Sequence, residues 1–401
     1  MRRSACLIAL LLATGAPGVV RAQAVDVAPL AAPDAFSTPG RDTGLPANLW
    51  RGASIATART VLPLLATKPL TPAGQQLARR VLATGAPGPV GAGSDPALLA
   101  VRASALSATG DPKAAAVLLA RAPGLDRSPE LARAAAENAL LAGQDAQACA
   151  AEEGLSAGRE DIYWLRLRAY CQAIGGKTTQ AQFTFELAQT QSRDAVFGRL
   201  MGVKLAGAGD PGAASLRNGL DFALSRSLGL NLEAAKPAPA VAAALAGGDP
   251  GPPTWDLTVL DPALAGLAGD MVAGQTLPAG GVSALIAAAA EADAKSRSKV
   301  QGQALLVAAL AGDLAPQDRA SLAAFAIPEG KASAARNLAL EDAARRKLMG
   351  ETALLALWTL TDAGAAGPPV ADRARIVHAL ALAGLTTEAR ALTLEGLLAA
   401  K

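Results

Sequence analysis

Residues 103–115 read ASALSATGDPKAA, and the same frame returns as AENALLAGQDAQA at 136–148, AYCQAIGGKTTQA at 169–181 and GVKLAGAGDPGAA at 202–214. A glycine stands at the eighth position of each copy, in steps of 33 residues: Gly110, Gly143, Gly176 and Gly209. The residues seven before and five after each glycine are small. A fixed period of this length in an Ala- and Leu-rich chain indicates stacked helical hairpins.

Each copy predicts one hairpin. A helix ends at the glycine, which can adopt a left-handed cap, and a second helix follows after a short turn. Gly110-Asp111-Pro112 and Gly209-Asp210-Pro211 show the pattern most clearly, because proline is tolerated in a first helical turn. We therefore expect a second helix directly after each of the four glycines.

The two small positions in phase with a turn glycine resemble the tetratricopeptide repeat, whose unit is about 34 residues long. The resemblance covers residues 95 to 228, and the aromatic and proline positions of that family's pattern are mostly absent. It implies an all-α, TPR-like α-solenoid of helical hairpins with a 33–34 residue period, interrupted by a Pro/Gly-rich linker. The chain also resembles exported Ala-rich helical proteins of proteobacteria, which implies a location and no activity.

Composition agrees with a solenoid. Of the 401 residues, 51% are hydrophobic but only 3% are aromatic, so there are few large side chains to fill the centre of one globular core. Small side chains suit the narrow space between stacked hairpins. The alternating patterns typical of strands do not occur.

We expect five segments along the chain. They are a signal peptide at 1–24, a disordered tether at 25–48, an N-terminal helical repeat domain at 49–231, a Pro/Gly-rich linker at 232–262 and a C-terminal helical domain at 263–401. Within the last segment, turns are expected at Gly312, Gly350 and Gly384.

The N-terminus predicts export. Arg2 and Arg3 precede an apolar run at 7–12, and Ala22-Gln23-Ala24 is a small-x-small cleavage site, with cleavage expected after Ala22 or Ala24. The expected location is the periplasm. No later segment approaches the roughly 18 apolar residues of a spanning helix, so we expect no stable membrane insertion after cleavage.

Charge argues against nucleic acid as a partner. Removal of residues 1–24 takes away three of the 37 basic side chains and none of the 34 acidic ones, which leaves equal numbers. A protein that binds phosphate backbones normally has a basic excess.

The mature chain keeps two cysteines, Cys149 and Cys171. In the repeat frame they lie on helices of adjacent units that pack together, and an oxidising compartment favours a disulfide between them. The alternative is two buried free thiols.

A binding surface follows from the tetratricopeptide frame, in which the first helix of each unit lines a concave groove. Ten residues before three of the glycines stand Arg133, Arg166 and Arg199, with Tyr163 and Tyr170 on neighbouring groove positions. Guanidinium groups in register suit the carboxylates of an acidic segment or a chain terminus. Alternatively, Arg133 pairs with Glu130 or Glu137 on its own helix, and Trp164, Phe183, Phe185 and Phe197 are core residues.

Candidate catalytic residues are few. The chain has one histidine, His378, and no nucleophile elbow, phosphate-binding loop or zinc-protease motif. We therefore expect no catalytic, cofactor or metal site, and a protein-binding scaffold or adaptor with an unidentified protein or peptide partner. The alternatives are an envelope enzyme acting on peptidoglycan or glycan, and an architectural protein that associates with itself.

Overall fold

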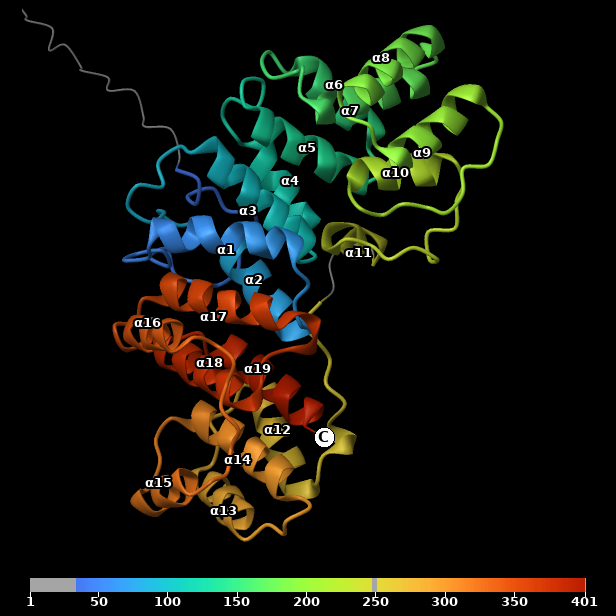
Figure 1. The fold of residues 1–401 in the computed structure, drawn as a ribbon. Coiled ribbons are helices and arrows are strands. Elements are labelled where there is room, and N and C mark those ends of the chain that lie inside the picture. Colours follow the sequence, from blue (N-terminus) through green and yellow to red (C-terminus); the bar gives the residue numbers. More distant parts are fainter. Residues whose placement is uncertain (1–33, 247–250, 401) are drawn as a thin grey trace, which may run out of the picture. The chain divides into compact units, whose positions relative to one another are not determined.

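The computed structural model describes residues 34–246 and 251–400 (Figure 1). Every regular element within these two stretches is helical, which confirms the all-α class. The predicted signal peptide and residues 25–33 of the predicted tether lie outside the described residues.

The helices of the first stretch are α1 (Ile55–Thr67), α2 (Pro72–Ala83), α3 (Pro96–Ala108), α4 (Pro112–Ala120), α5 (Pro129–Leu141), α6 (Asp145–Gly154), α7 (Ile162–Ile174), α8 (Thr178–Gln191), α9 (Ala195–Ala206), α10 (Gly219–Ser227) and α11 (Pro239–Leu245). Those of the second are η1 (Leu257–Val259), α12 (Pro262–Val272), α13 (Ala279–Ala290), α14 (Arg297–Ala311), α15 (Pro316–Ala323), α16 (Ala334–Arg345), α17 (Met349–Ala363), η2 (Gly364–Ala366), α18 (Val370–Ala383) and α19 (Thr386–Ala399).

The first three repeat glycines form the predicted turns. Gly110, Gly143 and Gly176 have φ values of 98°, 75° and 74°, and each separates two helices that pack together: α3 with α4, α5 with α6, and α7 with α8. The residue after each glycine donates its N–H, at 2.8 Å, to the carbonyl five residues earlier. This is the hydrogen bond of a left-handed helix cap. The hairpin prediction is confirmed at these three positions.

The fourth repeat differs from the prediction. Gly207, at φ 67°, already ends α9, and α10 begins only at Gly219. Asp210 accepts the N–H of Gly212 at 2.7 Å and so forms a local turn where a second helix was expected. The expectation of a helix directly after Gly209 is therefore wrong. After this loop α10 packs on α5 and α9, and α11 packs on α3 and α1.

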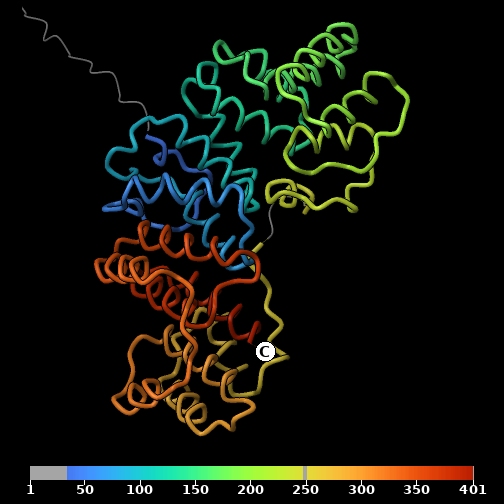
Figure 2. The backbone as a smooth tube through the Cα atoms, viewed as in Figure 1, coloured from blue at the N-terminus to red at the C-terminus, as the bar shows by residue number. Residues whose placement is uncertain are grey.

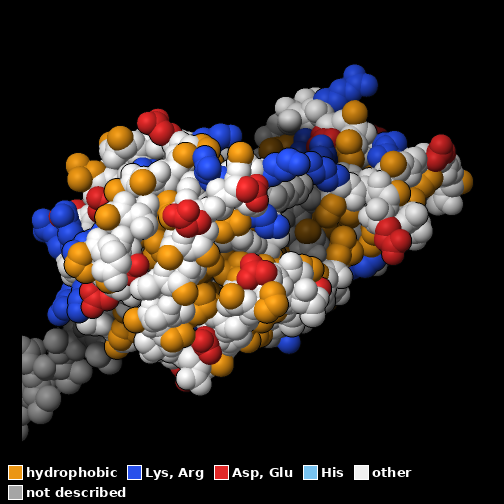
Figure 3. All heavy atoms as spheres, turned by 90° about the horizontal axis from the view of Figure 1, so that it is seen from below, with side chains coloured by type: hydrophobic (Ala, Val, Ile, Leu, Met, Phe, Trp, Pro, Cys, Tyr) orange, Lys and Arg blue, Asp and Glu red, His pale blue; other side chains and the backbone are white. Residues whose placement is uncertain are grey.

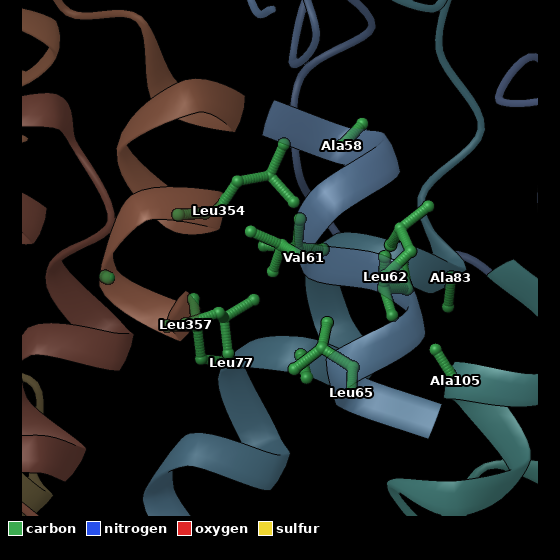
Figure 4. Close-up of a cluster of buried hydrophobic side chains, with 14 of the residues drawn as sticks. Ala58, Val61, Leu62, Leu65, Leu77, Ala83, Ala105, Leu354 and Leu357 are labelled. Atoms are coloured by element: carbon green, nitrogen blue, oxygen red, sulfur yellow. The ribbon is translucent and has the colours of Figure 1, made fainter. Parts of the chain in front are cut away.

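The C-terminal helices pack on α1 and α2. In Figure 2 the chain's last helices lie beside its first ones, and α17 contacts α1 and α2 while α19 contacts α2. Figure 4 shows Leu354 and Leu357 of α17 facing Val61 and Leu77, and all four side chains are fully buried. Helices from both sides of the predicted linker thus share one hydrophobic core.

Two carboxylates strengthen this contact. Glu351 of α17 accepts the Ser54 N–H and the Thr57 hydroxyl, both at 2.8 Å, at the N-terminus of α1. Glu395 of α19 accepts the Ala73 N–H at 3.0 Å, in the first turn of α2. Carboxylates satisfy the unpaired N–H groups at a helix N-terminus and interact favourably with its dipole.

One turn in the C-terminal helices is displaced from its predicted place. Gly312 and Gly384 end α14 and α18 as expected, but the turn predicted at Gly350 occurs at Lys347, which has a φ of 55°. Gly350 lies inside α17 instead, where a Cβ atom would come within 2.7 Å of the Leu49 carbonyl oxygen. The glycine allows a close approach of two chain segments rather than a turn.

Residues 34–36 are held by a buried arginine. The Arg102 guanidinium donates to the carbonyls of Leu82 at 2.8 Å, Ala35 at 3.0 Å and Thr84 at 2.9 Å. Burial lowers the pKa of Arg102 to about 9, and the charge of Asp34 opposes that shift. Phe36 beneath it is fully buried, so this part of the predicted tether packs against α2 and α3.

None of the helices in the described stretches has the length and hydrophobicity that crossing a bilayer requires. On the face shown in Figure 3, acidic and basic side chains are interspersed among hydrophobic ones.

Candidate functional site

The three predicted arginines lie on α5, α7 and α9, and we call the surface that carries Arg133, Arg166 and Arg199 the arginine face. Two of them stack on an aromatic ring of the next first helix along the chain. The Arg133 guanidinium lies 4.4 Å from the centre of the Tyr163 ring, and that of Arg166 lies 5.6 Å from the Phe197 ring. Cation–π contacts of this kind join α5 to α7 and α7 to α9.

Arg166 is also bound to the segment between α8 and α9. It donates to the Ser192 carbonyl at 3.0 Å and lies 3.4 Å from the carboxylate of Asp194. Asp194 is the N-cap of α9 and accepts the N–H groups of Val196 and Phe197. Arg166 therefore helps to fix the start of α9.

Arg199 holds the loop that replaces the fourth hairpin. It donates to the Ala213 carbonyl at 2.8 Å, and a Cβ at Gly212 would lie 2.6 Å from its Nη1 atom. The loop thus covers Arg199.

Arg133 is the exposed member of the set. Its guanidinium makes no ion pair or hydrogen bond among the described residues; it lies over the Tyr163 ring, and its charge acts on the nearby Glu137 carboxyl group. The two glutamates considered as its partners bind elsewhere: Glu130 accepts the Ser128 hydroxyl at 2.9 Å, and Glu137 accepts a backbone N–H of α10. The structure therefore presents Arg133 to solvent in a fixed orientation.

The two predicted groove tyrosines are largely buried. Tyr163 is 8% exposed, and Tyr170 is 0% exposed with its hydroxyl donating to Asp145 at 3.1 Å. Burial, and then the nearby carboxylate, raise the pKa of both hydroxyls, through Glu137 for Tyr163 and Asp145 for Tyr170. Their rings support the arginine face from below, as do Trp164 and Phe197 within the same core.

The segment from Ala213 to Arg226 runs along the arginine face. It begins at Arg199, continues through Arg217, which binds both Asp194 and Asp221, and reaches α5 at Gly219. The Gly219 N–H donates to the Glu137 carboxylate at 2.6 Å. Further along α10, Arg226 binds Asp145 at 2.6 Å. The chain's own helix therefore occupies part of the predicted groove.

Glu137 is the centre of this contact. Burial raises the pKa of its carboxyl group, and the Gly219 N–H, the Tyr163 hydroxyl and the charge of Arg133 only partly oppose that rise. The acid is thus less readily ionised than an exposed glutamate. Sequence reasoning considered Glu137 only as a helix-surface partner of Arg133, because its contact with Gly219 spans 82 residues of chain.

The predicted cysteine pair is at disulfide distance. Cys149 on α6 and Cys171 on α7 have Cα atoms 5.6 Å apart and bonded sulfur atoms. These helices belong to adjacent hairpins, as the repeat frame predicted, so the bond joins two units behind the arginine face.

One predicted core residue is exposed. Phe183 of α8 is 71% exposed and Leu187, one turn later, is 46% exposed, whereas Phe185 is partly buried against Phe197. Helical spacing distinguishes the two, because Phe185 lies four residues after the buried Ala181 and three before the buried Ala188, whereas Phe183 is out of phase with both.

Within residues 34–246 and 251–400, no group of three or more His, Cys, Asp and Glu side chains is placed to hold a metal ion. Comparison of the chain with protein-family models, curated proteins and solved structures finds no match.

Proposed function

We propose that this chain is a periplasmic protein-binding scaffold, built as a TPR-like α-solenoid, which binds an acidic segment of a partner protein on the arginine face. The observation that carries the proposal is Arg133, which is exposed, stacked on Tyr163 and engaged in no ion pair or hydrogen bond among the described residues. A guanidinium held in one orientation loses little rotamer entropy on binding, and its planar donors suit a bidentate carboxylate.

The neighbouring contacts support the same proposal. Arg166 and Arg199 are occupied by Asp194 and the Ala213 carbonyl, so their role is to shape the face, and Arg133 is the residue that meets the partner. The chain's own α10 packs on α5 beside Arg133, which supports the view that the arginine face can bind a peptide segment.

Photo-crosslinking tests the proposal. A photoreactive residue replaces the exposed Glu130, one turn before Arg133 on α5, in one protein and the exposed Arg121, on the C-cap of α4, in another, so that Arg133 itself is kept. We expect a crosslinked partner peptide rich in Asp and Glu from position 130 and none from position 121. Equal crosslinking from both positions would count against a specific face. Export is tested separately, because the mature protein should begin at Gln23 or Val25.

A further inference from the structure

A second concave site lies away from the arginine face, between α14, α16 and α18 and the segment that follows α15. The cavity has a volume of about 650 Å³. This is within the range of small-molecule sites, which are commonly about 300–1,000 Å³ and mostly apolar. We call it the α18 hollow.

One stripe of α18 forms the floor of the hollow. The lining residues recur at helical spacing: Ala371, Ala374, Arg375, His378, Ala379 and Leu382. At a rise of 1.5 Å per residue this stripe is about 16 Å long, so the hollow is elongated. Alanines from all three helices line it: Ala308, Ala309, Ala344, Ala371, Ala374 and Ala379.

The segment that follows α15 closes one end of the α18 hollow, and buried polar groups hold it in place. The Gln301 side chain of α14 accepts the Ala326 N–H at 3.0 Å, and the Asp372 carboxylate of α18 accepts the Ala332 N–H at 3.1 Å. Gln301 is 5% exposed and Asp372 is 2% exposed. The hollow is therefore preformed, which reduces the entropy that binding would cost.

The polar side chains of the lining are those of Arg345, Arg375, Glu329, Glu341 and His378. Arg375 lies 3.4 Å from Asp372, but that carboxylate also accepts the N–H groups of Lys331 and Ala332. His378 Nδ1 lies 3.3 Å from the Ala309 carbonyl oxygen, which can only accept a hydrogen bond. Arg375 lies one turn before His378 on the same face of α18 and supplies the guanidinium donors of the floor.

We propose that the α18 hollow binds a linear aliphatic monocarboxylate. Its chain lies along the alanine stripe against Leu305, Phe325 and Ile327, and its carboxylate binds the Arg375 guanidinium. The aliphatic walls favour the alkyl chain, and the charged donors of Arg375, whose side chain is 45% exposed, favour the acid over a neutral head group.

Calorimetric titration of the mature protein with decanoate, and with 1-decanol as the neutral counterpart, tests this. We expect decanoate to bind at one site, and Arg375→Gln to weaken it by about tenfold, as loss of one charged hydrogen bond implies. The matched control is Arg346→Gln, which removes an exposed charge outside the hollow and should leave the affinity unchanged.

Two substitutions to larger side chains test where the alkyl chain of the ligand lies. Ala371→Phe and Leu382→Trp narrow opposite ends of the floor at partly exposed positions, and each should abolish binding while the thermal unfolding midpoint stays near that of the parent. Absence of decanoate binding by the parent would overturn the proposal. So would binding that Arg375→Gln leaves unchanged, or an equal affinity for 1-decanol. Should either filling variant unfold, the Arg375→Gln titration still decides the question.

Discussion

The Glu137 carboxylate accepts a hydrogen bond from the Gly219 backbone N–H at 2.6 Å and so joins α5 to the first turn of α10. A Cβ at Gly219 would lie 2.8 Å from the same carboxylate, so the contact depends on glycine as well as on the acid. Together with the Arg226–Asp145 pair, it holds the chain after α9 against the arginine face instead of in a fourth hairpin.

Replacement of Glu137 by alanine should loosen this segment. It leaves the buried Gly219 N–H without an acceptor, at a cost of about 1–3 kcal/mol in unfolding free energy. Hydrogen exchange followed by mass spectrometry should then be faster over residues 213–227 and unchanged over α3 and α4. The exposed Glu153→Ala on α6 is the control and should leave exchange as in the parent. Faster exchange over the whole chain would contradict a local role.

The raised pKa of Glu137 predicts a pH dependence of stability. The folded protein retains this proton to a higher pH than the unfolded chain, because burial raises the pKa above its ordinary value of 4.5. The stabilisation by protonation is therefore complete below 4.5 and is lost as the pH rises through the raised pKa. Unfolding free energies measured by urea across this window should decline more for the parent than for Glu137→Gln. Parallel curves would show that the carboxyl group titrates alike in both states.

The Cys149–Cys171 bond should stabilise the array. The cysteines are 22 residues apart, and closing a loop of that length contributes about 3 kcal/mol in the chain-entropy model. A reductant should lower the urea midpoint of the parent and leave that of a Cys149→Ser, Cys171→Ser double variant unchanged. Thiol titration of the unfolded, unreduced mature protein should find no free thiol. Detection of two thiols would exclude the bond.

The contact of α17 with α1 and α2 should be essential to the fold. Leu357→Ala removes a fully buried side chain from the shared core and should cost about 2–5 kcal/mol. Leu338→Ala on α16 is the control, because Leu338 is 64% exposed and should tolerate the change. A single unfolding transition that shifts in Leu357→Ala is expected. A split into two transitions, with only one affected, would indicate that the N- and C-terminal helices fold separately.

Local sequence determined what could be predicted. The turns at Gly110, Gly143 and Gly176 depend on one residue conformation and on hydrogen bonds within a few positions, so their repeat was sufficient to place them. Gly209 has the same local pattern as Gly110, but Gly207 ends α9 first and distant contacts with Glu137 and Asp145 take the chain elsewhere. No local pattern carries that information.

At the candidate site, too, local features could be predicted from the sequence and long-range contacts could not. The 33-residue register predicted that Arg133, Arg166 and Arg199 occupy corresponding positions, and the structure places them on α5, α7 and α9. The burial of Tyr170 and the binding of Arg199 by the Ala213 carbonyl depend on which segments lie above them, and these were not visible in the sequence. The turn predicted at Gly350 likewise occurs at Lys347, which adopts a positive φ although it is not a glycine. Gly350 instead allows the close approach of α17 to Leu49, a contact between distant segments.

The most direct test of the scaffold proposal is quantitative affinity capture of the mature protein from crosslinked cells. It compares the parent with Arg133→Glu and with Arg121→Glu, a charge reversal at another exposed arginine, on the C-cap of α4. We predict a partner that the parent and Arg121→Glu capture alike and that Arg133→Glu, still folded by circular dichroism, loses. Capture of the same proteins by all three forms, or of none by any, would contradict the proposal that the arginine face binds a protein.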